Sequence, residues 1–138
     1  SISLPMALKT IGNDALKGTG LRTIEIPKSV FWLGDGLLAD CQSIEHVTIP
    51  ENIGRIPDRM FEGCTSLKKV ELHEKLGAIG ERAFFGCSSL DFIVIPDSVK
   101  QIGQDAFTNT DKQFIIQCSF GSYAEKYARK NKFKYQLV

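Results

Sequence analysis

The sequence predicts an α/β solenoid, a stack of short parallel strands closed at its C-terminal end by a helical cap. Three observations predict it: a 23-residue pattern that recurs along the chain, a pair of apolar positions two residues apart in each copy, and a C-terminal segment that departs from this pattern. Four copies align directly, at residues 21–43, 44–66, 67–89 and 90–112. A period of about 20–29 residues with apolar residues at fixed offsets is typical of leucine-rich-repeat-type solenoids.

The repeats define the expected domain organisation. A partial copy precedes the four full ones, so residues 1–112 are expected to form the repeats and residues 113–138 a diverged last repeat with the cap. Because each copy packs only against its neighbours, the whole chain is expected to be one solenoid domain.

Each copy contains an apolar pair whose members point to the same face of a strand. The first column is Ile24, Val47, Val70, Ile93 and Ile116, and the second is Ile26, Ile49, Leu72, Ile95 and Cys118. Ile2 and Leu4 supply the same pair in the first turn. One short strand per turn, and about six parallel strands in all, is the simplest interpretation. The strands end at prolines, which lack the N–H donor that a strand needs, at Pro5, Pro27, Pro50 and Pro96.

The remainder of each copy predicts a tight turn and one short helical turn. A second apolar pair leads to a glycine column, Gly12, Gly34, Gly80 and Gly103, from which Pro57 departs. An Ala-Phe-like pair then follows, so a column of aromatic rings is expected in the core. Hydrogen-bond acceptors suited to helix capping stand just before that pair, namely Asn13, Asp35, Asp58, Glu81 and Gln104.

The ending after residue 120 predicts a cap. Ser122 and Glu125 have the spacing of a capping box at a helix start, and Ala124 and Ala128 lie on one face of the helix that follows. The alternation of Phe133, Tyr135 and Leu137 then predicts a final short strand.

Composition excludes several classes of function. The chain has 17 basic and 16 acidic residues, so no global charge directs it to nucleic acid. The imbalance is local, because residues 122–138 carry five basic side chains and one acidic one. No apolar run approaches the ~20 residues that a membrane-spanning helix needs, and the first residues do not resemble a signal peptide. Membrane insertion is therefore not expected.

No catalytic, metal or cofactor site is evident. Cys41, Cys64 and Cys87 stand one period apart, which favours a buried packing column over disulfides, and four free thiols are expected. His46 and His73 occupy different columns, so a shared metal is not expected. The nucleophile elbow, zincin, phosphate-loop and dinucleotide motifs are all missing. The chain is not expected to be an enzyme.

Candidate binding residues are those displayed between the buried strand columns. They are Thr23, Glu25, His46, Thr48, Lys69, Glu71, Phe92, Val94, Ile115 and Gln117. This surface changes from polar to apolar along the stack, and an exposed apolar patch commonly marks an interface. The alternative is that residues 133–138 fold over the apolar end as part of the cap. Phe31 and Trp32 are a second candidate, because other copies lack aromatics at these positions and aromatics are enriched at binding hot spots. Alternatively, they cover the Leu37-Leu38 turn.

The repeat unit, with its Ile-Pro, Ile-Gly and Ala-Phe-x-Gly-Cys elements, resembles the BspA-like class of leucine-rich repeats. The tail from Gly121 is similar to the ending of many such arrays. The resemblance covers nearly the whole chain. It implies a curved solenoid at the cell surface or outside the cell, whose members are thought to act in adhesion to host matrix or neighbouring cells.

Two functional hypotheses remain. The first is a non-enzymatic interaction module that contacts a protein or glycan on a host or neighbouring cell through its concave strand face. The second is a structural spacer in a larger surface protein, without a ligand of its own. In either case the open front edge, at Ile2 and Leu4, invites self-association.

Overall fold

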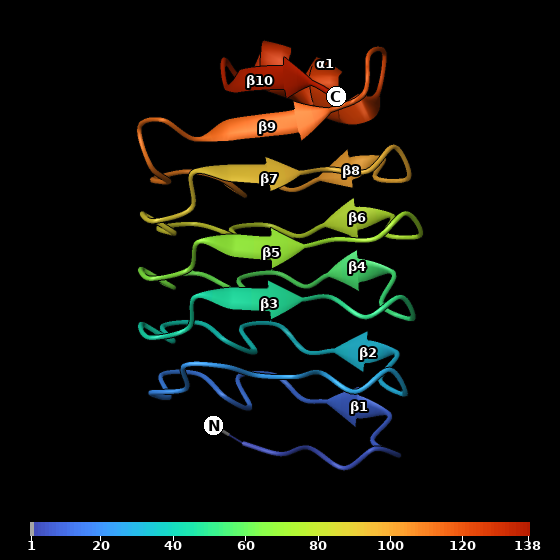
Figure 1. Ribbon diagram of the computed structural model, residues 1–138, viewed down its shortest axis with the longest axis vertical. Coiled ribbons are helices and arrows are strands. Elements are labelled where there is room, and N and C mark those ends of the chain that lie inside the picture. The colour runs from blue at the N-terminus through green and yellow to red at the C-terminus, as the bar shows by residue number, and fades with distance from the viewer. Residues whose placement is uncertain (1) are drawn as a thin grey trace.

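The computed structural model describes residues 2–138, and they form a stack of parallel turns with one helix at the C-terminal end (Figure 1). The front of the stack carries β3 (His46–Thr48), β5 (Lys69–Glu71), β7 (Phe92–Val94), β9 (Ile115–Cys118) and β10 (Lys134–Leu137). All pairings between these strands are parallel, as predicted. We call the outward surface of this series, with the equivalent residues 23 and 25, the strand face. Figure 1 shows little curvature over this length of stack.

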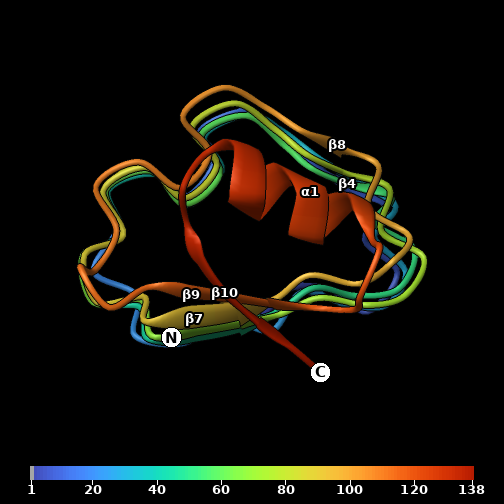
Figure 2. The same cartoon turned by 90° about the horizontal axis from the view of Figure 1, so that it is seen from above.

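The strand prediction was wrong in one respect, because each turn contains two strand positions. The second series comprises β1 (Thr10–Ile11), β2 (Trp32–Leu33), β4 (Arg55–Ile56), β6 (Ala78–Ile79) and β8 (Gln101–Ile102). Figure 2, seen along the stack, shows this series on a different side from the front strands. The last residue of each of these strands, Ile11, Leu33, Ile56, Ile79 or Ile102, is the second member of the second apolar pair, and it is buried. The backbones of these strands also pair between turns.

The predicted strands of the first two turns are not formed. Residues 2–4 and 23–26 have no strand assignment, although Ile24 and Ile26 are buried at the expected positions. The expectation for Ile2 and Leu4 was wrong, because Ile2 is 41% exposed and Leu4 is only partly buried, in a turn that has a neighbour on one side only among the described residues. From Ile24 onward, the apolar pattern predicted which side chains face the core, but not which backbones pair.

The predicted short helical turn is also wrong. The segments 58–63, 81–86 and 104–109 are non-helical turns, and the second residue of each is left-handed, at Arg59, Arg82 and Asp105. A helix cannot continue through such residues. The backbone bonds between turns instead, as in the Phe61 N–H to Ala83 carbonyl bond of 2.8 Å and the Phe84 N–H to Ala106 carbonyl bond of 2.8 Å. The stack thus has a third side held by hydrogen bonds between turns.

The aromatic column forms the centre of the core, as predicted. The rings of Phe61, Phe84 and Phe107 stack with centroids 5.2 Å apart, and each side chain is at most 1% exposed. Phe114 continues the series at 5.2 Å from Phe107, and Phe133 packs edge-on against both. The column therefore runs without interruption from the repeats into the cap.

The cysteine column is confirmed as a set of buried free thiols. Each thiol donates a hydrogen bond of 3.1 Å to a carbonyl of the preceding turn: Cys41 to Leu16, Cys64 to Leu38 and Cys87 to Phe61. Burial raises the pKa of the Cys64 thiol to about 12 and that of Cys87 even further. These thiols are therefore packing elements and weak nucleophiles.

These pKa shifts predict a loss of stability at alkaline pH. The folded state holds the thiol protons more tightly than the unfolded state, whose thiol pKa is near 9.0, so stability is full below that pH and falls above it. Between about pH 9 and pH 10 we expect each of the two thiols to lose about 1 kcal/mol of its contribution to the free energy of unfolding. Urea unfolding at both pH values measures the change. A Cys64→Ala/Cys87→Ala variant should show a flatter dependence on pH, and an unchanged slope would contradict the assignment to these thiols.

The cap begins with the helix α1 (Tyr123–Lys130), which lies across the end of the stack (Figure 2). Ser122 caps it by accepting the Glu125 N–H at 3.1 Å, as the capping box predicted, while Glu125 accepts the Gly121 N–H at 2.7 Å. Ala124 and Ala128 are fully buried, and Tyr127 contacts the Phe107 ring edge-on. The helix therefore seals the aromatic column. None of the described helices is long and apolar enough to span a membrane.

Candidate interaction surface

The strand face presents two columns of side chains at equivalent positions of successive repeats, which the strand register aligns within each sheet. His46, Lys69, Phe92 and Ile115 form the first column, and Thr48, Glu71, Val94 and Gln117 form the second. The pairing of β9 with β10 adds Lys134 and Gln136 to these columns. The structure therefore brings together eight of the candidates named from the sequence. Thr23 and Glu25 are exposed in the preceding turn, which has no strand there.

The half of the strand face nearer the N-terminus is a connected polar cluster. Glu71 accepts a hydrogen bond from His46 Nε2 at 2.8 Å and another from Thr48 Oγ1 at 2.9 Å, and the Lys69 ammonium lies 4.0 Å from its other oxygen. The hydrogen bond from Thr48, followed by that from His46, lowers the pKa of the Glu71 carboxyl. The cluster is exposed, so its contribution to stability is small. What the cluster offers is a fixed set of hydrogen-bond donors and acceptors at the surface.

The other half of the strand face is apolar. Val94 is 47% exposed, and Phe92 and Ile115 beside it are half-buried. The alternative that residues 133–138 fold over these side chains is wrong. The last segment instead pairs edge to edge with β9 as the next parallel strand, in line with Lys134↔Ile115 and Gln136↔Gln117. A hydrogen bond of 3.0 Å between the Gln117 and Gln136 side chains follows from this register.

A shallow groove separates the polar half from the apolar half. The front strands form two sheets, β3-β5 and β7-β9-β10, so β5 and β7 are neighbours without a strand pairing. The groove is lined by side chains from both halves, namely Lys69, Glu71, Leu72, Phe92 and Val94. An apolar anchor and charged groups therefore face the same depression.

Phe31 and Trp32 form a second exposed site on another side of the stack. The two residues are 58% and 49% exposed, whereas Leu37 and Leu38 are fully buried. The two rings line a groove that continues over the next turn to Gly54, Arg55 and Pro57. Arg55 extends beside it and forms an ion pair of 2.8 Å with Asp58.

Pro57, which departs from the glycine column, explains why this groove exists. In the glycine column, the N–H groups of Gly34, Gly80 and Gly103 each donate a 2.8 Å bond to the preceding turn. Pro57 has no N–H and carries a ring, so the equivalent bond to Leu33 is impossible. The pairing of β2 with β4 is missing, and Figure 1 shows these strands farther apart than β4 and β6. A proline in a glycine column was the available signal.

The polar residues expected to cap helices serve a different purpose. Asn13 Oδ1 accepts the Asp35 N–H at 2.8 Å, Asp35 accepts the Asp58 N–H at 3.1 Å, and Asp58 accepts the Glu81 N–H at 2.8 Å. Asn13, Asp35 and Asp58 thus each cap the equivalent residue of the next turn, whereas Glu81 and Gln104 make no such bond. This use satisfies N–H groups between the first turns of the stack.

No constellation typical of catalysis was found along residues 2–138. No group of three or more metal-ligating side chains occurs within this part of the chain. His46 bonds to Glu71, whereas His73 bonds to the Ile53 carbonyl at 2.8 Å, so the two histidines serve separate local contacts. The described surfaces offer apolar anchors and hydrogen-bonding groups.

Comparison with known proteins agrees with this architecture. The model of the BspA type leucine rich repeat region matches residues 1–113, with six copies. A leucine rich cell surface protein from Faecalibacterium prausnitzii A2-165 is 35% identical, with a TM-score of 0.74, over 80% of this chain and 29% of that one. A leucine-rich repeat protein from Bacteroides ovatus ATCC 8483 has the same fold, with a TM-score of 0.59 and 23% identity over 99% of this chain and 47% of that one.

The chain thus spans less than half the length of either of these proteins. No curated protein matches it. The matched residues, 1–113, include the repeats whose periodic apolar positions build the core. The chain therefore belongs to the BspA-type leucine-rich repeat family, a class of surface repeat proteins.

Proposed function

We propose that this chain is a non-enzymatic interaction module, displayed at the cell surface, that binds a protein or glycan of a host or neighbouring cell through its strand face. The observation that supports this most directly is the uncovered apolar half of that face, with Val94 47% exposed beside Phe92. Exposing an apolar side chain to water costs free energy, and an exposed apolar patch rimmed by polar groups is typical of an interface.

The polar half supplies what an apolar anchor lacks, which is orientation. The Glu71 carboxylate is held by His46 and Thr48 before any partner arrives, so little side-chain entropy is lost on binding. The groove between β5 and β7 places this cluster next to Phe92. An anchor with adjacent fixed polar groups is the usual anatomy of an interface.

The groove at Phe31 and Trp32 is the second surface in the proposal. It combines two half-exposed rings with the Arg55–Asp58 ion pair. Trp and Arg are enriched among the residues that dominate binding energy, which supports its inclusion. The two surfaces are testable separately, because they lie on different sides of the stack (Figure 2).

A binding screen tests the proposal. The purified chain, shown to be monomeric by light scattering, is tested against extracellular-matrix proteins and cell-surface glycans. We expect Phe92→Ser or Trp32→Ala to weaken a saturable interaction by about 5- to 30-fold, because each removes an anchor worth about 1–2 kcal/mol. Lys100→Ala changes an exposed residue beside β8 and serves as the matched control. Equal retention of both aromatic variants would exclude the assigned surfaces.

The alternative function is a structural spacer. The chain spans 29% and 47% of the two bacterial proteins that share its fold, which favours a role as one part of a longer array. A clean negative in the binding screen from a folded monomer would support the spacer and contradict the interaction module.

A further inference from the structure

The cap end of the stack carries a concentration of cations. Residues 122–138 contain five of them, Lys126, Arg129, Lys130, Lys132 and Lys134, and all except Lys134 lie outside the strand face that the proposed function uses. Six ion pairs occur among residues 2–138, and none of the six includes these side chains. The acidic residue of this segment, Glu125, is buried against the Gly121 N–H. The positive charge is therefore left to the solvent.

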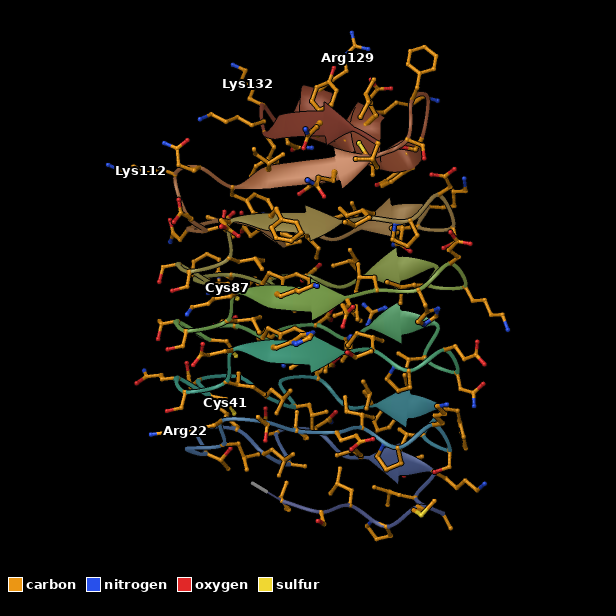
Figure 3. All side chains as sticks on the ribbon, viewed as in Figure 1. Arg22, Cys41, Cys87, Lys112, Arg129 and Lys132 are labelled. Atoms are coloured by element: carbon orange, nitrogen blue, oxygen red, sulfur yellow. The ribbon has the colours of Figure 1, made fainter. Side chains whose placement is uncertain are left out.

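The fold directs these charges to one surface. Lys126, Arg129 and Lys130 are exposed on one face of α1, at i, i+3 and i+4, opposite the buried Ala124 and Ala128. Figure 3 shows Arg129 and Lys132 directed away from the stack at its C-terminal end. From the preceding turn, Asp105 lines the same groove as Lys126 and Lys130 and offsets part of their charge. Arg129 and Lys132 do not line that groove, so Asp105 does not face them there.

An apolar side chain accompanies the cations. Phe120 is 85% exposed, in the turn that connects β9 to α1, and Figure 1 shows that connection rising at the same end of the stack. A soluble polyanion would need only the charges. Lysine and arginine together with a projecting aromatic ring are typical of surfaces that adsorb to membranes, where the cations meet anionic headgroups and the ring enters the interface.

We propose that the cap end docks peripherally on an anionic lipid surface, through Lys126, Arg129, Lys130 and Lys132 with Phe120 at the interface. Charge complementarity selects acidic headgroups, and the exposed ring selects a lipid surface over a dissolved polyanion. Docking at this end stands the stack upright on the membrane. The strand face, which lies along the side of the stack, then remains free for its own partner.

Cosedimentation with vesicles tests this surface. We expect the chain to sediment with phosphatidylcholine vesicles that contain phosphatidylglycerol, to remain soluble with phosphatidylcholine alone, and to be released as salt is raised. An Arg129→Glu/Lys130→Glu variant should bind at least about 25-fold more weakly, since each lost cation weakens binding about fivefold. A Lys9→Glu/Lys17→Glu variant, altered at exposed lysines of the first turn, is the matched control and should bind normally.

Two further variants separate the outcomes. Phe120→Ser should weaken vesicle binding about tenfold while leaving retention on heparin-agarose unchanged, because only a lipid interface accommodates the ring. Lys132→Gln is a milder change, used with circular dichroism to verify that any loss does not reflect unfolding. Failure to bind acidic vesicles, or binding that Phe120→Ser does not weaken, would overturn the proposal. Phe92→Ser should leave vesicle binding unchanged, because Phe92 lies on the strand face. The membrane proposal and the strand-face proposal are therefore tested independently of each other.

Discussion

Replacing Phe84 with alanine is expected to lower the free energy of unfolding by about 3–5 kcal/mol, the usual cost of truncating a buried phenylalanine. The ring is completely buried and stacks on Phe61 and Phe107, each at 5.2 Å. Its removal leaves a cavity that neither neighbour can fill, since both are held by their own turns. Urea or thermal unfolding monitored by circular dichroism measures the loss.

The control for this prediction is Phe31→Ala. That ring is 58% exposed and lies outside the aromatic column, so we expect its loss to change stability by at most about 0.5 kcal/mol. Comparable destabilisation by the two variants would show that the aromatic column is not the principal source of stability. Because turns interact only with their neighbours, the Phe84 variant should also unfold less cooperatively.

Gly103→Ala is expected to destabilise the fold by about 2–4 kcal/mol, near the upper end of the costs of overpacking. A Cβ at this position would lie 2.5 Å from the Glu81 nitrogen and 2.8 Å from the Gly80 carbonyl carbon, and both atoms belong to the backbone of the preceding turn. The turns would have to separate, which also lengthens the 2.8 Å bond from the Gly103 N–H to the Ile79 carbonyl. Chemical denaturation gives the size of the loss.

Gly12→Ala is the matched control, because Gly12 occupies the same repeat position and a Cβ there would meet nothing within 4 Å. We expect this substitution to be neutral within about 0.5 kcal/mol. If both alanine variants were equally stable, close approach between turns would not explain the glycine column. The separation of β2 from β4 at Pro57 would then need another cause.

The sequence determined which side chains form the core. The 23-residue period placed the phenylalanine column and the cysteine column, which are buried as predicted, and the apolar columns, which are buried from Ile24 onward except for the partly buried Leu72. This succeeds because burial depends on a side chain's position in the repeat, and each repeat sees the same neighbours. The capping box at Ser122 was predictable for a similar reason, since it depends on two residues three apart.

The pairing of backbones between turns was decided by tertiary structure. Arg59 and Arg82 adopt left-handed conformations that their residue type does not favour, and in them their own N–H groups donate to the Glu81 and Gln104 carbonyls of the next turn. A sequence pattern shows neither these left-handed conformations, with their hydrogen bonds between turns, nor the second series of strands. Both depend on the distance between turns, which small residues shorten and Pro57 lengthens.

For the strand face, too, the sequence predicted one part and the tertiary structure decided the other. The sequence placed Phe92, Val94 and Ile115 on the strand face, because strand alternation is a local property. Whether these side chains are exposed depends on where residues 134–137 pair. The alternation of apolar and polar residues in that segment is compatible both with a strand that covers the strand face and with a strand that extends it. Edge pairing with β9 gives partners to the backbone groups that β9 and β10 turn toward each other, whereas crossing the face would leave these groups without strand partners. Only the folded cap, with α1 positioning β10 at the edge, decided that this apolar surface stays open.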